Sequence, residues 1–352
     1  MSQESSKNIP RVAIVLLAYN SLHLVKKFLP KIISTTPGDA DHPIILVDNA
    51  STDNTNEWMR KNHPNIRVIQ LKVNKGFTNG YQESLPQIEA QNYVLISSDI
   101  EVTPGWLEPA LQRLQSDEKI AAVQPKIKSY DRRDEFEYAG AAGGFMDKWG
   151  FPFCRGRIFD EVEKDQGQYD TPIQIFWASG ACLCINADAY HKAGGLDNDY
   201  FAHFEEIDLC WRLQRMGCKI MYEPAGEVYH MGGSVIKYGS AGKVYRNHRN
   251  NLITLLKNVS TAKLLYLIPL RFALDAAAAA LMLTQKNPAA AAAVFKAHIH
   301  FIAGLPKWTA KRKALEHLPR GAKSVYGMYP KSVVLDFFVR GKKKFSQLNL
   351  RF

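Results

Sequence analysis

Five short polar segments carry residue types that can do chemistry, and each follows an apolar or aromatic run. The segments are Ala18-Tyr19-Asn20, Asp48-Asn49-Ala50-Ser51-Thr52-Asp53, Asn74-Lys75-Gly76-Phe77-Thr78-Asn79-Gly80, Ser97-Ser98-Asp99-Ile100-Glu101 and Phe204-Glu205-Glu206-Ile207-Asp208. Neither G-x-x-x-x-G-K-[ST] nor a G-x-G-x-x-G after the first apolar run is present. The sequence therefore lacks the fingerprints of a P-loop and of a dinucleotide-binding Rossmann domain.

The second and third segments have residues suited to a nucleotide. Asp48 and Asn49 can hydrogen-bond a nucleobase or ribose, because a carboxylate accepts from imino or hydroxyl donors and an amide both donates and accepts. The same pattern is equally typical of an Asx turn with a helix N-cap, and the sequence leaves both interpretations open. Gly76 permits close backbone approach and Lys75 places a cation near a helix start, which suits a phosphate-bearing ligand.

Two acids of the fourth segment form a candidate metal site. Asp99 and Glu101 are spaced i, i+2 on an extended segment, so they lie on one side of it. Carboxylate oxygens suit Mg²⁺ or Mn²⁺ shared with a diphosphate. The alternative is a pair of solvated loop acids. His230 lies at the end of a predicted strand before a Gly-rich loop; it is a candidate to complete the site, although a lone histidine is more often structural.

The fifth segment is the strongest cluster of acids. Glu205, Glu206 and Asp208 lie at the start of a predicted helix, where the helix dipole alone would favour negative charge. They also follow the aromatic run 200–204, so at least one acid is expected to face a partly enclosed cleft. Enclosure raises the pKa of a carboxyl group into the range of a general base.

The elements that position these segments alternate in type. β-branched runs alternate with helical stretches from Val12 to Ile127, a pattern typical of βα units with a mainly parallel sheet. Strands are expected at 12–18, 44–48, 66–71, 93–97 and 121–124, and helices at 22–34, 55–62, 77–90 and 104–116. The loops at the carboxyl ends of such strands converge on one site, which places the first four polar segments together.

The middle of the chain is less regular. Residues 128–172 are polar and Gly-rich, and they are expected to form an irregular insertion or flap. A strand-like stretch then covers 173–185. Helices are expected at 187–193 and 204–216, and a strand at 219–223.

The C-terminal part differs in composition from the rest. The formal net charge is +11, and residues 311–352 alone hold eleven Lys or Arg against two acids. Upstream, the mostly apolar run 264–284 is long enough to span a bilayer, but Arg271 and Asp275 near its middle make an interfacial or protein-packed helix the favoured interpretation. Aromatic residues among the basic ones suit a bilayer interface as well as nucleic acid. Because the apolar helix is adjacent, we expect the basic segment to bind a membrane surface and not nucleic acid.

The composition indicates a globular protein in a reducing compartment. The 352 residues are 46% hydrophobic and 22% charged, and the five cysteines form no C-x-x-C pair or zinc framework. No secretory signal is visible at the start, so a cytoplasmic location is expected. The expected organisation is a disordered terminus at 1–10, an α/β domain at 11–258 and a helical membrane-associating region at 259–352.

Taken together and in order, these motifs resemble family 2 inverting glycosyltransferases of the GT-A fold, above all the rhamnosyltransferase-like branch that builds bacterial cell-surface polysaccharides. The resemblance covers about 12–258. Ala18-Tyr19-Asn20 and the segment from Val47 to Asp53 are similar to the nucleotide-sugar entry motifs, which implies that Asp48 contacts the base. The entry motifs also imply that Asn49 binds the donor, and the segment from Asn74 to Gly80 resembles N-x-G-F-x-x-G, which implies the same of Asn74, Gly76 and Phe77.

The other motifs extend the resemblance towards the metal and the acceptor. Ser98-Asp99-Ile100-Glu101 occupies the place of the family's D-x-D, with Glu as its second acid, and His230 matches the metal-binding histidine. Trp177-Ala178-Ser179-Gly180-Ala181 is similar to the segment that lines the sugar and acceptor pocket, to which Asp208 is also assigned. The stretch 205–209 stands at the base motif E-D, which implies Glu206 or Glu205 as the base.

The function implied is inverting transfer of a sugar from a dTDP-, UDP- or GDP-linked donor, with a divalent metal, to a hydroxyl of a glycan or lipid-linked acceptor. The enzyme would work at the inner face of the cell membrane. One rival is a sugar nucleotidyltransferase, which normally shows a basic Gly-rich loop where this chain has Ala18-Tyr19-Asn20. Another is a membrane-docked binding protein with a degenerate transferase domain, because Glu replaces Asp in two motifs.

Overall fold

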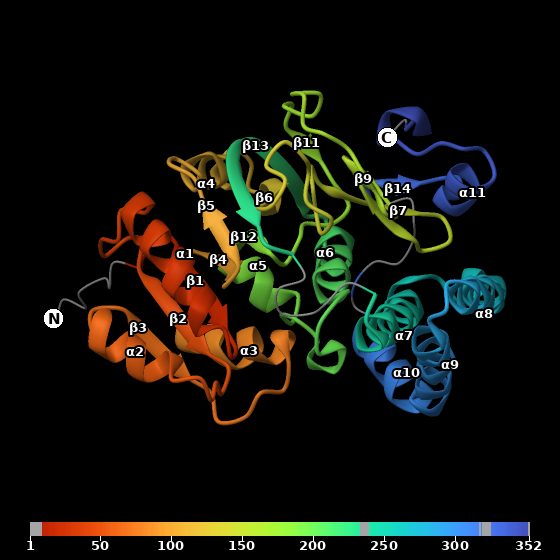
Figure 1. Cartoon of the computed structure of the whole chain (residues 1–352), viewed down its shortest axis with the longest axis horizontal. Helices are drawn as coiled ribbons and strands as arrows, with labels where there is room; N and C mark the ends of the chain where they lie inside the picture. Colours follow the sequence, from red (N-terminus) through yellow and green to blue (C-terminus); the bar gives the residue numbers. More distant parts are fainter. Residues whose placement is uncertain (1–8, 233–238, 317, 319–324, 351–352) are drawn as a thin grey trace, which may run out of the picture.

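The computed structural model describes residues 9–232, 239–316, 318 and 325–350. Within these residues a nine-stranded mixed sheet forms the centre of the molecule (Figure 1). Its N-terminal half is parallel, in the order β4-β1-β2-β3. The strands of this half are β1 (Ala13–Ala18), β2 (Ile44–Asp48), β3 (Arg67–Gln70) and β4 (Asn92–Ser97). Their carboxyl ends share one edge, as expected for βα units.

The other half of the sheet is mixed. Strand β12 (Cys182–Asn186) lies antiparallel between β4 and β6 (Ile120–Ser129). Strand β13 (Lys219–His230) runs parallel to β6, and the short strands β5 (Ile100–Val102) and β11 (Ile173–Gln174) pair antiparallel with it. This pairing brings the end of β13 beside the segment that follows β4.

Both faces of the sheet are covered, which explains the nearly unbroken apolar strands. Alternate residues of β1 enter two separate cores, with Val15 in one and Ile14 in the other. Helices on the Ile14 side are α1 (Leu22–Thr35), α2 (Thr55–Asn62) and α4 (Glu108–Gln115). Helices on the Val15 side are α3 (Phe77–Ser84), extended by η1 (Leu85–Gln87), α5 (Ala187–Lys192) and α6 (Glu205–Arg215), with η2 (Asn198–Tyr200) before α6.

The expected α/β architecture is confirmed, with two differences in detail. The stretch 173–185 is not one strand, because residues 175–181 leave the sheet between β11 and β12. Residues 128–172 are not irregular throughout: they contain most of a second sheet, in the order β10-β9-β8-β7-β14. Its strands are β7 (Gly144–Asp147), β8 (Pro152–Cys154), β9 (Arg157–Ile158), β10 (Glu161–Val162) and β14 (Met328–Tyr329). Strands of two to four residues are too short to show a periodicity.

The C-terminal region is mostly helical, as expected, but strand β14 ties it to β7. Its helices are α7 (Ala241–Asn258), α8 (Thr261–Thr284), α9 (Pro288–Ala303), α10 (Leu305–Ala314), α11 (Val333–Phe338) and η4 (Phe345–Leu348). Helix α7 packs against α6, α9 and α10, so it connects this region to the main sheet (Figure 1). Residues 1–8 of the terminus expected to be disordered lie outside the described residues.

Helix α8 is long and apolar enough to cross a membrane, by length and composition. The bent pair α9 and α10, with a 63° angle, would be a second candidate if it formed one span. Two charged residues in the middle of α8 point into the protein: Arg271 is 3% exposed and its guanidinium lies 3.6 Å from the Phe151 ring centroid, and Asp275 is 1% exposed. Asp275 Oδ2 lies 3.0 Å from His298 Nε2 and 3.1 Å from His248 Nδ1.

Candidate active site

The loops after β1 and β2 are tied together at the parallel edge. Asn20, whose φ is 46°, accepts a hydrogen bond from the Thr52 amide at 2.7 Å. Asp53 accepts one from the Leu22 amide at 2.8 Å, at the start of α1. Ala18 is buried and pairs with Asp48, while Tyr19 is 39% exposed beside them. Hydrogen bonds therefore join the two predicted donor-binding loops into one unit.

Asp48 forms the Asx turn of its motif and also keeps one carboxylate oxygen for a ligand. Its carboxylate is fully buried, and Oδ1 accepts from the Ser51 amide at 2.9 Å, which is the Asx turn. Among the described residues Oδ2 has no hydrogen-bond partner. A buried carboxylate oxygen without a partner is costly, so it suits a donor supplied by a ligand.

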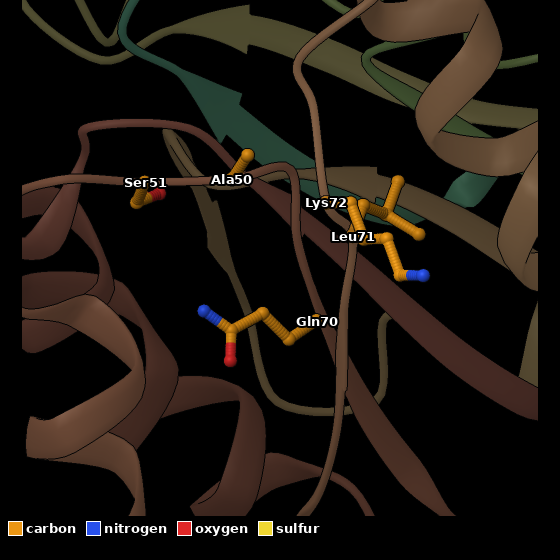
Figure 2. A pocket seen from close by; sticks show the side chains of 5 residues that line it. All are labelled: Ala50, Ser51, Gln70, Leu71 and Lys72. Carbon is orange, nitrogen blue, oxygen red and sulfur yellow. The ribbon is translucent and has the colours of Figure 1, made fainter.

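An open hollow lies between the loop after β2 and the end of β3 (Figure 2). Its lining residues are Ala50, Ser51, Gln70, Leu71 and Lys72. The side chain of Gln70 enters the hollow from one side, and those of Ala50 and Ser51 lie across from it (Figure 2). Gln70 and Lys72 were not among the predicted site residues, although their place at the carboxyl end of the third strand is a usable signal.

The third segment is held against the other two by amide contacts. The Asn49 side chain donates to Asn74 Oδ1 and to the Gly76 carbonyl, both at 3.1 Å. Gly76 has φ of +103°, and a Cβ there would lie 2.5 Å from the Phe201 carbonyl oxygen. The Phe201 carbonyl also accepts from the Thr78 amide at 3.2 Å. The structure thus brings Asn49, Asn74 and Gly76 together, and it adds Phe201, which the sequence analysis did not assign to the site.

The candidate metal ligands Asp99 and His230 meet. Asp99 follows β4 and His230 ends β13, and Asp99 Oδ1 lies 3.3 Å from His230 Nε2. Glu137, which sequence analysis missed, places Oε1 3.4 Å from the other ring nitrogen. Burial alone would lower the pKa of His230, but these two carboxylates raise it well above its ordinary value. Ser98, beside Asp99, donates to Ser21 Oγ at 3.1 Å.

The structure does not bring Glu101 to this pair. Glu101 forms an ion pair with Arg133 at 2.8 Å. His230 is opposite Ile100 in the β5–β13 ladder, and side chains alternate along a strand, so Glu101 is on the other face. The expectation that Glu101 binds the metal is therefore not met, because the i, i+2 argument fails where the chain turns at Asp99 before the strand begins. Among the described residues, no group of three or more His, Cys, Asp or Glu could hold a metal ion.

The carboxylates Glu205 and Glu206 begin α6 at the centre of the molecule. Glu205 is 4% exposed, and a Cβ built at Gly180 would lie 3.9 Å from its Oε1 and 3.5 Å from the Phe77 ring. Neither glutamate has a partner for Oε2 among the described residues. Burial, and then the charge of Glu206, raises the pKa of Glu205 well above its ordinary value. Burial raises the pKa of Glu206 to about 7, in the range of a base at neutral pH.

Asp208 and Trp177 make their side-chain contacts outside the candidate site. Asp208 is fully buried, 2.9 Å from Arg212 Nε and 2.8 Å from Lys257 Nζ, and it accepts from Asn258. The pocket role expected for Asp208 is therefore not met, because its place on α6 turns it towards α7. Trp177 is 4% exposed and donates to the Phe145 carbonyl at 3.0 Å in the second sheet. From that segment Gly180 lies beside Glu205 and Phe77, and Ala181 is buried behind it.

The fold and the site define a glycosyltransferase with the GT-A fold. Residues 13–181 match the model of the family described as Glycosyl transferase family 2. Over 256 residues it is 22% identical to the N-acetylglucosaminyl-diphospho-decaprenol L-rhamnosyltransferase of Mycobacterium tuberculosis, which covers 69% of this chain and 83% of that protein.

Two solved structures are similar in fold. GalNAc-T7, solved with UDP, GalNAc and Mn²⁺, has a TM-score of 0.54 at 14% identity, over 73% of this chain and 49% of that one. The mannosyltransferase PcManGT of Pyrobaculum calidifontis, solved with GDP-Man and Mn²⁺, has a TM-score of 0.51 at 15% identity, over 88% of this chain and 86% of that one. At these identities the likeness concerns the fold.

Proposed function

We propose that this chain transfers a sugar from a nucleoside-diphosphate donor to a hydroxyl of a lipid-linked saccharide, with inversion, in the synthesis of a cell-surface polysaccharide. One observation carries the proposal: Glu205 and Glu206 each have a buried carboxylate oxygen without a partner among the described residues, Glu205 lies beside Gly180, and the loop before them packs through Phe201 on Gly76 of the donor segment. The rhamnosyltransferase relative supports the choice of a lipid-linked acceptor.

The reaction is a single in-line displacement. Glu206 takes the proton from the acceptor hydroxyl, since its pKa of about 7 makes it a carboxylate at slightly alkaline pH. The acceptor oxygen bonds to the anomeric carbon as the bond from that carbon to the diphosphate oxygen breaks, and the electron pair leaves with the nucleoside diphosphate. Attack opposite the leaving group inverts the configuration. Asp48 Oδ2 accepts a hydrogen bond from the nucleotide, and the connected loops hold the donor in line.

A divalent metal fits the pair Asp99 and His230. The Asp99 carboxylate and the imidazole of His230 already face each other at 3.3 Å, a donor set that suits Mn²⁺ or Mg²⁺ when diphosphate oxygens supply the remaining ligands. When bound, the metal neutralises charge on the leaving diphosphate. Asp99 and His230 would hold it, with Glu137 fixing the imidazole from its other nitrogen.

We also propose that the protein docks on the cytoplasmic face of the membrane. The exposed side of α8 carries Leu265 and Tyr266, 77% and 56% exposed, while Arg271 and Asp275 of that helix are buried. Ile299 of α9 is 63% exposed, and Phe338 at the end of α11 is 59% exposed. These helices lie at the end of the molecule away from β3 (Figure 1). Exposed apolar surface of this extent is typical of a membrane interaction site.

The basic tail contributes less charge to that surface than its composition suggests. Lys311, Arg340, Lys342 and Lys343 each form an ion pair with a carboxylate of this chain, such as Lys343 with Glu161 at 2.7 Å. Apolar contact therefore carries most of the docking.

The experiment that tests the activity is a panel of UDP-, dTDP- and GDP-sugars, with Mn²⁺ or with chelator. We expect a metal-dependent rise in Tm and slow donor hydrolysis for one nucleotide class, and transfer of the opposite anomer to a lipid-linked saccharide. A rise in Tm without hydrolysis or transfer would instead support the degenerate binding protein. Formation of a sugar nucleotide from a sugar phosphate would support a nucleotidyltransferase.

A further inference from the structure

The loop that leads into the two glutamates is held in a strained conformation. Phe201, His203 and Phe204 all have positive φ, at 67°, 71° and 73°, and none of them is glycine. Such backbone costs of order 1–3 kcal/mol per residue and persists only when its surroundings impose it. The main constraint comes from a helix on the other side of the loop.

That constraint is the side chain of Asn250 on α7. Asn250 is fully buried, and its amide donates to the carbonyls of Tyr200 at 3.0 Å, Ala202 at 3.0 Å and His203 at 2.7 Å. An amide has two N–H groups, so three acceptors use its donor capacity completely. One side chain thus fixes three of the four carbonyls that directly precede Phe204.

Arg249 fixes the other end of that amide. It donates to Asn250 Oδ1 from Nε at 3.0 Å and from Nη2 at 2.8 Å, and Nη2 also reaches the Asp199 carbonyl at 2.5 Å. The orientation of the amide is thereby set, because its oxygen faces a guanidinium and its nitrogen faces carbonyls. The loop is also fixed from the opposite side, where Phe201 packs on Gly76.

We propose that Asn250 is a positioning residue for the transferase reaction: it holds loop 199–204 so that Glu205 stays buried, Glu206 keeps a carboxylate oxygen shielded from solvent, and both stay aligned beside the donor segment. This inference rests on the proposed function. The charge of Glu206 raises the pKa values of its titratable neighbours Glu205 and, one turn along α6, Cys210, whereas burial raises the pKa of Glu206 itself. Without the amide contacts the loop relaxes, water reaches the carboxylates, and the base loses its alignment with the acceptor hydroxyl.

Helix α7 provides a matched control. Asn251 is 2% exposed and donates to the Gly150 carbonyl at 2.6 Å, outside the site. Asn250→Ala and Asn251→Ala therefore each remove a buried asparagine from the same helix. We expect both variants to lower Tm, but only Asn250→Ala to lower kcat, by about 10²-fold as for an ångström-scale misplacement. We also expect Asn250→Ala to move the acid limb of the kcat–pH profile to lower pH, because hydration lowers the pKa of the base.

The pH dependence of Tm provides a readout without substrate. In the wild type, the raised pKa values of the glutamates make stability fall as pH rises from about 4.5 towards 7; this fall becomes shallower in Asn250→Ala but not in Asn251→Ala. If Asn250→Ala does not fold, Arg249→Lys provides a milder loosening, with smaller changes of the same sign. Equal kcat and equal pH profiles for the two alanine variants overturn the inference. A wild type with no transfer, but with this Tm difference between variants, contradicts the proposed function alone.

Discussion

Asp99 Oδ1 lies 3.3 Å from His230 Nε2, at the point where the segment after β4 passes the end of β13. We predict that Asp99→Asn abolishes the Mn²⁺-dependent rise in Tm with nucleoside diphosphate and lowers kcat at least about 10²-fold, because the leaving diphosphate loses its counter-charge. Isothermal calorimetry of Mn²⁺ with the nucleotide measures the first effect. Glu101→Gln is the control, since Glu101 binds Arg133 instead, and it should retain the metal response. If Glu101→Gln also lost the metal response, Glu101 would have to be counted among the metal ligands.

Glu206 is the proposed base, and its removal should separate binding from turnover. Glu206→Gln keeps the shape of the side chain and removes the basic oxygen, so kcat should fall by about 10²–10⁴-fold while donor affinity stays within a few fold. In the wild type, kcat should rise with pH through an apparent pKa near 7. A Glu206→Gln variant with wild-type kcat would sink the assignment, and a loss confined to Glu205→Gln would transfer the role to that residue.

The same substitution should stabilise the fold at high pH. The pKa of Glu206 is higher in the folded protein than in the unfolded chain, so the unfolded state binds fewer protons between pH 4.5 and 7 and stability falls over that window. Glutamine does not titrate, so Glu206→Gln should exceed the wild type at pH 8, by an amount on the order of 2 kcal/mol, with a smaller difference at pH 5. Urea unfolding at the two pH values provides the comparison. A larger gain at pH 5 would contradict the sign.

Much of the fold could be predicted from the sequence, because its first strands are apolar and separated by helices of ordinary length. The order of Asp48, Gly76 and Asp99 at one edge follows from that alternation. The second sheet could not be predicted, since strand β9 has two residues and its sheet is completed by β14, far along the chain. The sequence pattern also could not predict which faces of α6 and β5 are turned towards the site. A shift of a residue or two along a helix or strand changes the direction of a side chain, so Asp208 faces Lys257 and Glu101 faces Arg133 instead of the site.

Asp208 should matter for stability rather than for chemistry. Asp208→Asn leaves Lys257 and Arg212 without their shared carboxylate in a buried network, and breaking such a pair costs about 3–5 kcal/mol. Chemical denaturation should show that loss, while donor affinity per folded molecule is unchanged. Asp134→Asn, which breaks the exposed pair with Lys164, is the control and should change stability little. A stable Asp208→Asn protein that fails to bind acceptor would restore the pocket role.

Gly76 should be intolerant of any side chain. Gly76→Ala strains a φ of +103° and also places a Cβ 2.5 Å from the Phe201 carbonyl, so the donor segment must move away from the loop before α6. Gly105→Ala is the control for backbone strain without a steric clash, since Gly105 has φ of +77° and nothing within 4 Å of its Cβ position. We expect both variants to lose stability and only Gly76→Ala to lose donor affinity, measured by titration of the nucleotide. Equal affinities in the two variants would show that the contact with Phe201 does not shape the donor site.

The apolar end of the molecule should bind a bilayer through its side chains rather than through net charge. Leu265, Ile299 and Phe338 are each more than half exposed, whereas several basic residues of the tail are already paired within the chain. The triple variant Leu265→Ser, Ile299→Ser, Phe338→Ser should sediment much less with vesicles of phosphatidylglycerol and phosphatidylcholine. Each substitution removes the about 1.5–3 kcal/mol that burial of an apolar side chain in the bilayer contributes to binding. Ile9→Ser, an exposed apolar residue at the other end of the chain, is the control and should sediment like the wild type. Binding that survives the triple variant but disappears at 1 M salt would show that charge, and not this apolar surface, holds the protein on the membrane.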